Sequence, residues 1–197
     1  MSDVLAAVRA RLSEHFDRIG AGREPTVASV TFLGAESIDV LRFGPDADDT
    51  LYHVSLGCSR HPMLDPTSMV VDSTSGPRAE VVVALRGSTP VGLARSIAIV
   101  AAAPAVEGLV LVPDALVDLE TPLWEGAPFT AVLLGPDDVE DVELPAPYEA
   151  VRILSATPIT PTEAAWVRLK GAEAMREAWR VDGVDVRDPR RRAANPT

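Results

Sequence analysis

Three residues near the end of one predicted strand have side chains that could bind a metal ion or carry out nucleophilic catalysis. They are His53, Cys58 and His61, in H-x4-C-x2-H spacing. Thiolate and imidazole groups suit zinc, and Asp65 is the nearest carboxylate that could supply a fourth ligand. Cysteine and histidine could also form a nucleophile and base if the fold brought them within hydrogen-bond reach. The same residues could equally lie at an ordinary strand-to-loop edge, so a small enzyme or zinc-binding protein is an alternative interpretation.

Glu80 is a charged residue at the entrance of an otherwise apolar run, two positions after Arg78. A charge at such a place requires a partner, which favours a structural ion pair or hydrogen bond and leaves ligand binding as the second option. The sequence contains no G-x-G-x-x-G, P-loop, G-x-S-x-G or H-E-x-x-H motif. We therefore predict no catalytic residues, no cofactor and no metal.

The composition limits the size of the domain and the kind of partner. The chain has 197 residues, of which 47% are hydrophobic, and a formal net charge of −11. This apolar content suffices for one sizeable core, so residues 1–186 are predicted to form a single domain. Nucleic acid selects clustered Lys and Arg, so a basic or neutral protein surface is the more favourable partner. The arginine-rich end, residues 187–197, is predicted to be a basic, flexible tail.

The sequence also indicates where the protein resides. Cys58 is the single cysteine, so an internal disulfide is impossible. The most apolar segment, residues 91–103, is interrupted by Arg95 and is shorter than the roughly 20 residues of a membrane helix. These features predict a cytoplasmic protein without a membrane segment. Lys170 is the only lysine among 18 basic residues, which suggests a GC-rich bacterial source.

Hydrophobic periodicity predicts the elements that must position these residues. Apolar positions recur at steps of three and four from Val4 to Ile19, which predicts an amphipathic helix ended by Gly20. A largely apolar segment predicts a buried helix over residues 90–102. Short apolar runs predict strands at residues 27–33, 38–43, 51–56, 79–85, 109–112, 129–134 and 151–156.

The last helix has the strongest start signal in the chain. Thr160 can cap it, Pro161 suits its first position, and Glu163 completes a capping box, which together contribute about 1 to 2 kcal/mol. Its predicted buried stripe is Ala165, Leu169, Ala172, Met175 and Trp179. With short connections between the first strands, the elements predict an α+β fold in which a mixed, largely antiparallel sheet is packed by about three helices.

A long loop from Gly57 to Pro77 interrupts this regular pattern. Loops of more than about 12 residues inside a compact domain are uncommon and tend to be functional or mobile. The loop and its flanking strand edges are therefore the predicted binding surface, where a peptide could add to an exposed edge. The candidate partner-binding residues are Ser59, Met63, Asp72, Arg78 and Glu80.

Four short motifs in fixed order resemble the suppressor of fused domain family. They are residues 52–63 (YHVSLGCSRHPM), 76–80 (GPRAE), 92–95 (GLAR) and 158–163 (PITPTE). Within the first motif, Ser55, Gly57 and Ser59 form an SxGxS-like pattern that leads to Pro62 and Met63. The resemblance runs from about residue 52 to residue 179, and it implies a suppressor of fused-like fold.

The resemblance also implies a function. Animal members of the family are two-lobed adaptors that hold an extended transcription-factor peptide between their lobes, whereas this chain matches the single lobe of bacterial members. Those bacterial members imply a role as an immunity protein that binds and neutralises a toxin domain. Negative charge suits such a role, because it steers tight association with a basic toxin. We therefore predict a non-enzymatic protein-binding domain with a basic protein or peptide partner.

Overall fold

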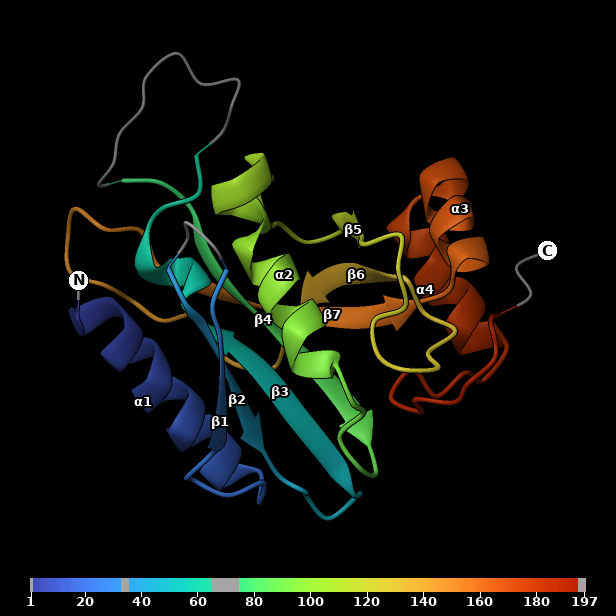
Figure 1. Ribbon diagram of the computed structural model, residues 1–197, viewed down its shortest axis with the longest axis horizontal. Helices are drawn as coiled ribbons and strands as arrows, with labels where there is room; N and C mark the ends of the chain where they lie inside the picture. Colours follow the sequence, from blue (N-terminus) through green and yellow to red (C-terminus); the bar gives the residue numbers. More distant parts are fainter. Residues whose placement is uncertain (1, 33–35, 65–74, 195–197) are drawn as a thin grey trace.

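The computed structural model describes residues 2–32, 36–64 and 75–194. Within these residues the chain forms a seven-stranded sheet in the order β1-β2-β3-β4-β7-β6-β5 (Figure 1). Neighbouring strands are antiparallel except for β4 and β7, which run parallel at the centre of the sheet. The predicted α+β fold with a mixed, largely antiparallel sheet is confirmed.

The strands and helices have the following bounds. The strands are β1 (Thr26–Val30), β2 (Ile38–Phe43), β3 (Thr50–Leu56), β4 (Arg78–Arg86), β5 (Leu116–Asp118), β6 (Ala131–Pro136) and β7 (Val151–Ile159). The helices are α1 (Ser2–Arg18), α2 (Leu93–Glu107), α3 (Pro161–Lys170) and α4 (Ala172–Val181), and a short 3₁₀ turn, η1 (Cys58–Arg60), follows β3.

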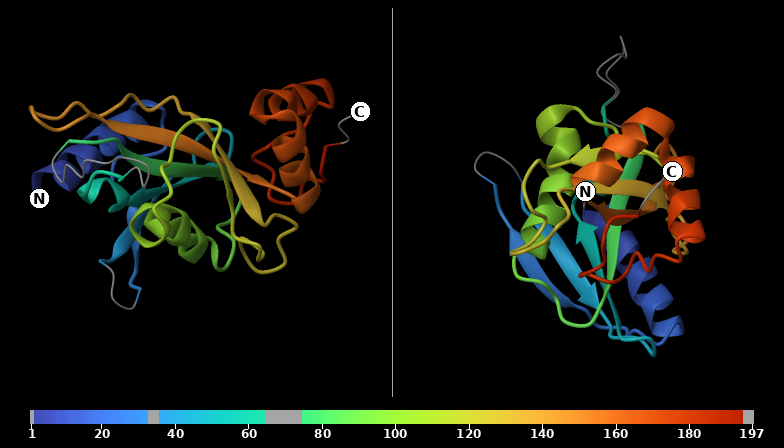
Figure 2. Two further views of the ribbon diagram at one scale, coloured as in Figure 1. Left: turned by 90° about the horizontal axis from the view of Figure 1, so that it is seen from above. Right: turned by 90° about the vertical axis from the view of Figure 1, so that its right-hand side faces the viewer.

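Helices cover both faces of the sheet (Figure 2). Along β4, Val81 and Val83 pack in the cluster that contains α2, whereas Val82 packs in the cluster that contains α1. Because successive side chains of a strand point to opposite faces, α1 and α2 lie on opposite sides of the sheet. The α3–α4 pair shares the α1 side and packs on β6 and β7 through Leu133 and Ile159. Over the described part of the chain, no helix has the length and apolar character that crossing a membrane requires.

One strand prediction is wrong and another is too long. Residues 109–112 form no strand, and the edge strand of this region is β5, which begins at Leu116. Leu111 is nevertheless buried, and its N–H donates to Met63 Sδ at 3.3 Å instead of to a neighbouring strand. Its apolar character therefore reflects core packing without strand pairing. The strand predicted at 27–33 ends at Val30, and its last position, Leu33, lies outside the described residues.

The last helical segment is two helices, where the sequence predicted one. The chain breaks between α3 and α4 at Gly171, whose φ of 89° lies in the left-handed region that favours glycine. The break rotates the second half of the segment, so the predicted stripe fails at Ala165 and Leu169, which are exposed. Met175 and Trp179 are buried as predicted.

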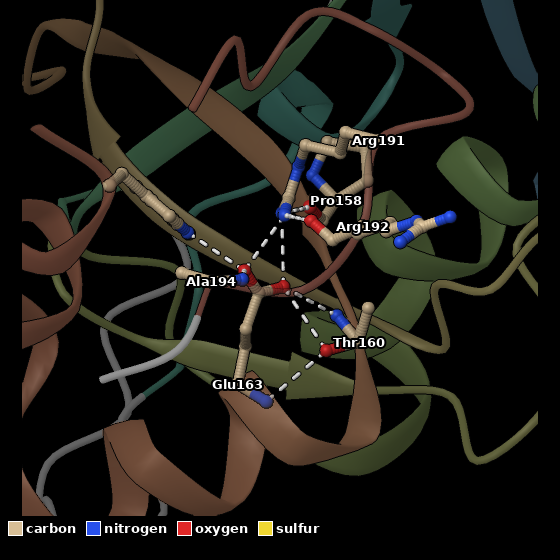
Figure 3. A network of polar contacts seen from close by, with 7 residues as sticks. Pro158, Thr160, Glu163, Arg191, Arg192 and Ala194 are labelled. Carbon is tan, nitrogen blue, oxygen red and sulfur yellow. Dashed lines mark hydrogen bonds and ion pairs between the residues drawn. The ribbon is translucent and has the colours of Figure 1, made fainter. Parts of the chain in front are cut away.

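Glu163 is fully buried and binds more groups than a capping residue needs (Figure 3). Its N–H donates to Thr160 Oγ1 at 3.2 Å and the Thr160 N–H donates to Glu163 Oε2 at 2.9 Å, so the predicted capping box is confirmed. Arg191 donates to both carboxylate oxygens, at 2.7 and 3.0 Å. Trp179 Nε1 and the Ala194 N–H also donate to Oε1, at 2.9 and 3.1 Å. The carboxylate therefore joins the last two helices to the end of the chain.

In the described part of the tail predicted at residues 187–197, the side chains of Arg191 and Ala194 are buried. Arg191 is buried, and its guanidinium lies over the rings of Phe129 and Trp179. The arginine run suggested a solvated terminus because its counter-ion, Glu163, stands 28 positions earlier in the sequence. Residues 195–197 lie outside the described residues.

Glu163→Ala should lower the free energy of unfolding by about 3 to 5 kcal/mol, because it leaves the Arg191 guanidinium buried without its counter-charge. Urea denaturation at neutral pH measures this difference. The matched control is Glu173→Ala on α4, because that side chain is 90% exposed and its loss should change stability little. Equal losses for the two variants would contradict the assigned role of Glu163.

The Glu163 contribution should disappear in acid. Burial raises the pKa of Glu163, but hydrogen bonds from Arg191 and Thr160 outweigh burial and hold the pKa below 4.5. The stabilisation is therefore fully present above the unfolded-state pKa and is lost as the pH falls through the lower folded-state pKa. The difference in free energy of unfolding between the wild type and Glu163→Ala should therefore decrease only as the pH falls below the unfolded-state pKa of Glu163. Urea denaturation at a series of pH values measures this difference.

Candidate functional site

The carboxylate of Glu80, near the start of β4, organises the turn that follows β3. This side chain is fully buried. It accepts hydrogen bonds from Ser55 Oγ, from the Gly57 N–H at 2.8 Å, and from the N–H and Oγ of Ser59 at 2.9 and 2.6 Å. The sequence predicted that the Glu80 charge needs a partner. The structure supplies neutral hydrogen-bond donors from the end of β3 and from the turn that follows it.

Arg78 also holds this turn, by hydrogen bonds to its backbone carbonyl groups. Its Nη1 donates to the carbonyl oxygens of Ser59 and Arg60, at 2.8 and 3.0 Å. Its guanidinium also lies 5.3 Å from the ring centroid of Tyr148. Two charged side chains of β4 thus bind the turn at different points, and together they fix its position relative to the central strand.

Gly57 allows the turn to pass close to β2. Its φ is 148°, and a Cβ at this position would lie only 2.9 Å from Ile38 Cδ1. A larger residue would therefore require the end of the Ile38 side chain to move, and it would have to adopt a φ that residues other than glycine rarely adopt. The serine–glycine–serine spacing is explained by this geometry, because both serines bind Glu80 while the glycine lies against β2.

The turn forms one wall of a groove of about 440 Å³, and the C-terminal end of α2 forms the other. We call it the α2 groove. Its lining is largely apolar and includes Ile38, Met63, Leu64, Ala101 and Val106. Leu64 and Val106 are 46% and 67% exposed, so the groove presents uncovered apolar side chains to solvent.

Charged residues stand at the rim of the α2 groove. Glu36 Oε2 lies 2.7 Å from His61 Nε2 and 3.3 Å from Arg60 Nη1. The hydrogen bond with His61 lowers the pKa of Glu36. An apolar floor with a charged rim is the usual anatomy of a protein–protein contact.

The structure does not bring the three residues of the possible zinc site together. His53 Nε2 lies 3.0 Å from Thr89 Oγ1, whereas His61 contacts Glu36 at the groove rim. No group of three or more potential metal ligands gathers anywhere in residues 2–32, 36–64 and 75–194. Asp65 lies outside this described part of the chain. The zinc-binding alternative is not supported.

Cys58 is also in an environment that does not activate a thiol. Burial raises the pKa of its thiol well above the ordinary value, and the Glu80 charge raises it further. Burial lowers the pKa of His53 to about 4, so this imidazole is neutral at physiological pH. A thiol that stays protonated is a weak nucleophile, so the arrangement does not favour covalent catalysis.

Four of the five predicted partner-binding residues surround the turn beneath the α2 groove. Ser59, Arg78 and Glu80 are buried. Ser59 donates to Glu80, and Arg78 donates to the Ser59 carbonyl oxygen. Met63 is also buried and lines the groove. Asp72 lies outside the described residues. The sequence did not indicate the contribution of α2, because its pattern predicted a largely buried helix that ends at residue 102, before Val106.

Comparison with known proteins gives one family. The sequence profile described as "Suppressor of fused protein (SUFU)" matches residues 34–192. This range includes both the β3–η1 turn and the buried Glu163 network. A sequence search of curated proteins gave no match.

Solved structures share the fold. A suppressor of fused homologue from Neisseria gonorrhoeae aligns with 99% of this chain and 98% of its own, at 18% identity and a TM-score of 0.65. The Sufu–Fu complex structure aligns over 96% of this chain and 91% of its own, at 12% identity and a TM-score of 0.70. Drosophila Suppressor of Fused aligns over 96% of this chain and 51% of its own, at 13% identity and a TM-score of 0.68. At these identities the likeness concerns the fold alone.

Glu80→Gln should destabilise the domain by about 2 to 3 kcal/mol, because one carboxylate oxygen is replaced by an amide that faces hydrogen-bond donors. Thermal unfolding followed by circular dichroism measures the change. Glu36→Gln is the control, since Glu36 is exposed at the rim and should tolerate the same replacement. A wild-type melting temperature for Glu80→Gln would contradict the role given to this carboxylate.

The Cys58 thiol should react slowly in the folded protein. We expect its reaction with Ellman's reagent at about pH 8 to be at least roughly tenfold slower than in the unfolded chain, because burial keeps the thiol protonated. Absorbance of the released thiolate follows the reaction. A fast reaction in the native protein, equal to that in guanidinium, would show that Cys58 is an accessible thiolate.

Proposed function

Because the chain belongs to the suppressor of fused protein family, we propose that it is a non-enzymatic protein-binding domain that holds its partner in the α2 groove. The observation that carries this proposal is a largely apolar groove, one wall of which is a turn held by hydrogen bonds to the buried carboxylate of Glu80. A solved structure with this fold is a complex of Sufu with Fu. Protein binding by a relative supports, for this chain, a partner that is also a protein.

The exposed apolar residues of the groove are suited to anchor a partner. Leu64 stands on the turn side and Val106 on the α2 side. Apolar side chains in the centre of a contact supply most of its binding energy, while a polar rim excludes water and selects the partner. Glu36, Arg60 and His61 would supply such a rim.

The five residues predicted from the sequence act in this proposal mainly through the shape of the groove. Ser59, Arg78 and Glu80 hold the turn, and Met63 forms part of the floor. Asp72 lies outside the described residues, and from the sequence alone we propose it as a partner contact. A preformed wall lowers the entropic cost of binding, because little of the protein must be ordered when the partner arrives.

We assign a basic partner on the basis of charge. The net charge of −11 would attract a basic protein over a distance of about one Debye length and would raise its association rate. An immunity protein that neutralises a basic toxin domain fits these requirements, because it needs fast, tight binding and no chemistry of its own. The cytoplasm, where a toxin would have to be stopped, is the compartment consistent with this role.

Val106→Asp should abolish recovery of the partner in an affinity pull-down from the native host lysate. The aspartate places a charge in the apolar contact, and desolvating it opposes binding. With the wild-type protein as bait, mass spectrometry should identify one basic protein in stoichiometric amount. The recovered amount should decrease as the salt concentration of the binding buffer is raised.

The matched control is Val91→Asp. Val91 is 73% exposed and precedes the N-terminal end of α2, so it offers the same substitution away from the groove. The control should recover the partner at the wild-type level. If Val106→Asp and Val91→Asp recover equal amounts, the partner binds outside the α2 groove.

A further inference from the structure

A second concavity lies on the opposite face of the sheet from the α2 groove. It has a volume of about 310 Å³ and is lined by residues of α1 and of the chain that follows α4. We call it the α1 cleft. Its floor is the sheet itself, formed by Val82 and Ala84 of β4 with Ser155 and Thr157 of β7. The space exists because α1 and the α3–α4 pair occupy separate parts of this face and leave the central strands uncovered between them.

One wall of the α1 cleft is acidic. Asp137 and Asp138 follow β6 and both line the space. Asp137 Oδ1 accepts from the Val139 N–H at 3.0 Å, which holds the carboxylate in place. Neither aspartate forms an ion pair with any residue that the structure describes. Burial raises the pKa of Asp137, and the neighbouring charge of Asp138 adds to this, so a positive group in the cleft would relieve both effects.

His15, on the same side of the cleft, offers a hydrogen-bond donor. It is only 6% exposed, and its Nδ1 lies 3.2 Å from the Arg18 guanidinium. Because a guanidinium can only donate, Nδ1 must accept, and the hydrogen of the neutral ring is on Nε2. Burial and the Arg18 charge lower the pKa of His15, which favours this neutral form. Within the described residues Nε2 has no partner, and the ring lines the cleft.

The other wall of the cleft carries a positive charge. Arg187 is held by its backbone, since its carbonyl oxygen accepts from the Arg86 N–H at 2.9 Å and its N–H donates to Asp185 Oδ1 at 3.1 Å. Its guanidinium makes no ion pair within the described residues. Tyr52 also lines the cleft, and both Arg187 and Asp137 act on its pKa, so charges of opposite sign stand near this one ring. The Tyr52 hydroxyl donates to Asp46 at 2.7 Å.

We propose that the α1 cleft binds a small zwitterion, an α-amino acid or a dipeptide. Its ammonium group would lie against Asp137 and Asp138, and its carboxylate would accept from Arg187 on the other wall. A ligand with both charges fits better than a simple cation or anion, because it pairs opposite charges that the protein leaves without ion-pair partners. The volume is at the lower end of the range for small-molecule sites, about 300 to 1,000 Å³, which limits the ligand to this size.

The alternative of a metal ion is less consistent with the cleft. No three potential ligands from the described residues converge in a metal-binding arrangement. The hydroxyl of Thr157 and the apolar floor at Val82 instead suit the side chain and backbone of an organic ligand. This inference concerns a different face of the domain and goes beyond the proposed partner binding.

Binding should be tested by thermal shift and titration calorimetry with each of the common L-amino acids and with alanylalanine as separate probes. We expect one probe, or a related subset, to raise the melting temperature and to give a one-to-one isotherm. Asp137→Asn retains the acceptor for Val139 while it removes the charge, and Arg187→Gln removes the opposite charge. Each variant should raise the dissociation constant by about tenfold or more, because each removes a charge-assisted hydrogen bond.

Two controls make the result specific. Glu173→Gln and Arg152→Gln remove exposed charges outside the cleft and should leave affinity unchanged. N-acetylation removes the ammonium charge and C-amidation removes the carboxylate charge, so each modified form of the bound probe should bind more weakly. A lower dissociation constant for the free amino acid or for the dipeptide shows which of the two the cleft prefers. The proposal is overturned if no probe binds the wild type, or if binding survives in both Asp137→Asn and Arg187→Gln.

Discussion

A carboxylate that is removed from water must accept its hydrogen bonds from the surrounding chain, and two such carboxylates hold irregular segments of this domain in place. Glu80 collects them from the turn after β3, which becomes a wall of the α2 groove. Glu163 collects them from α3, α4 and Arg191, which ties residues 187–194 to the sheet. In both cases one buried charge fixes the conformation of a segment that lacks regular secondary structure.

The elements that the sequence predicted well are those that a local pattern determines. α1 follows an amphipathic period, β4 follows a continuous apolar run, and α3 begins at a capping box in which donors and acceptors are three residues apart. The failures required information from distant parts of the chain. Leu111 is apolar because it enters the core, and only the tertiary structure shows that Met63 replaces a strand as the acceptor for its N–H. Similarly, Arg191 resembled a solvated residue until its distant counter-ion was known.

The candidate site was predicted in part for the same reason. The sequence indicated that Glu80 needs a partner and that the following loop interrupts the regular pattern, and both features meet at one turn. It could not show that Ser59 and Arg78 turn inward, because a charged or polar residue in a loop is usually solvated. The surface of the groove comes instead from Val106 and its neighbours, whose exposure depends on where α2 ends relative to the turn. Such a relation between distant segments leaves no periodic signal.

The α2 groove and the α1 cleft lie on opposite faces of the sheet. Glu80, near the start of β4, holds the turn that forms one wall of the groove, and Ala84, four residues later on the same strand, lies in the cleft floor. Between them β4 pairs with β7 up to Val82 and with β3 from Val82 onward, so its backbone is held along its whole length. Packed interiors change by discrete rearrangement and not by gradual deformation. Occupation of one site would therefore reach the other only through a shift of the whole central sheet, and the architecture favours two surfaces that bind independently.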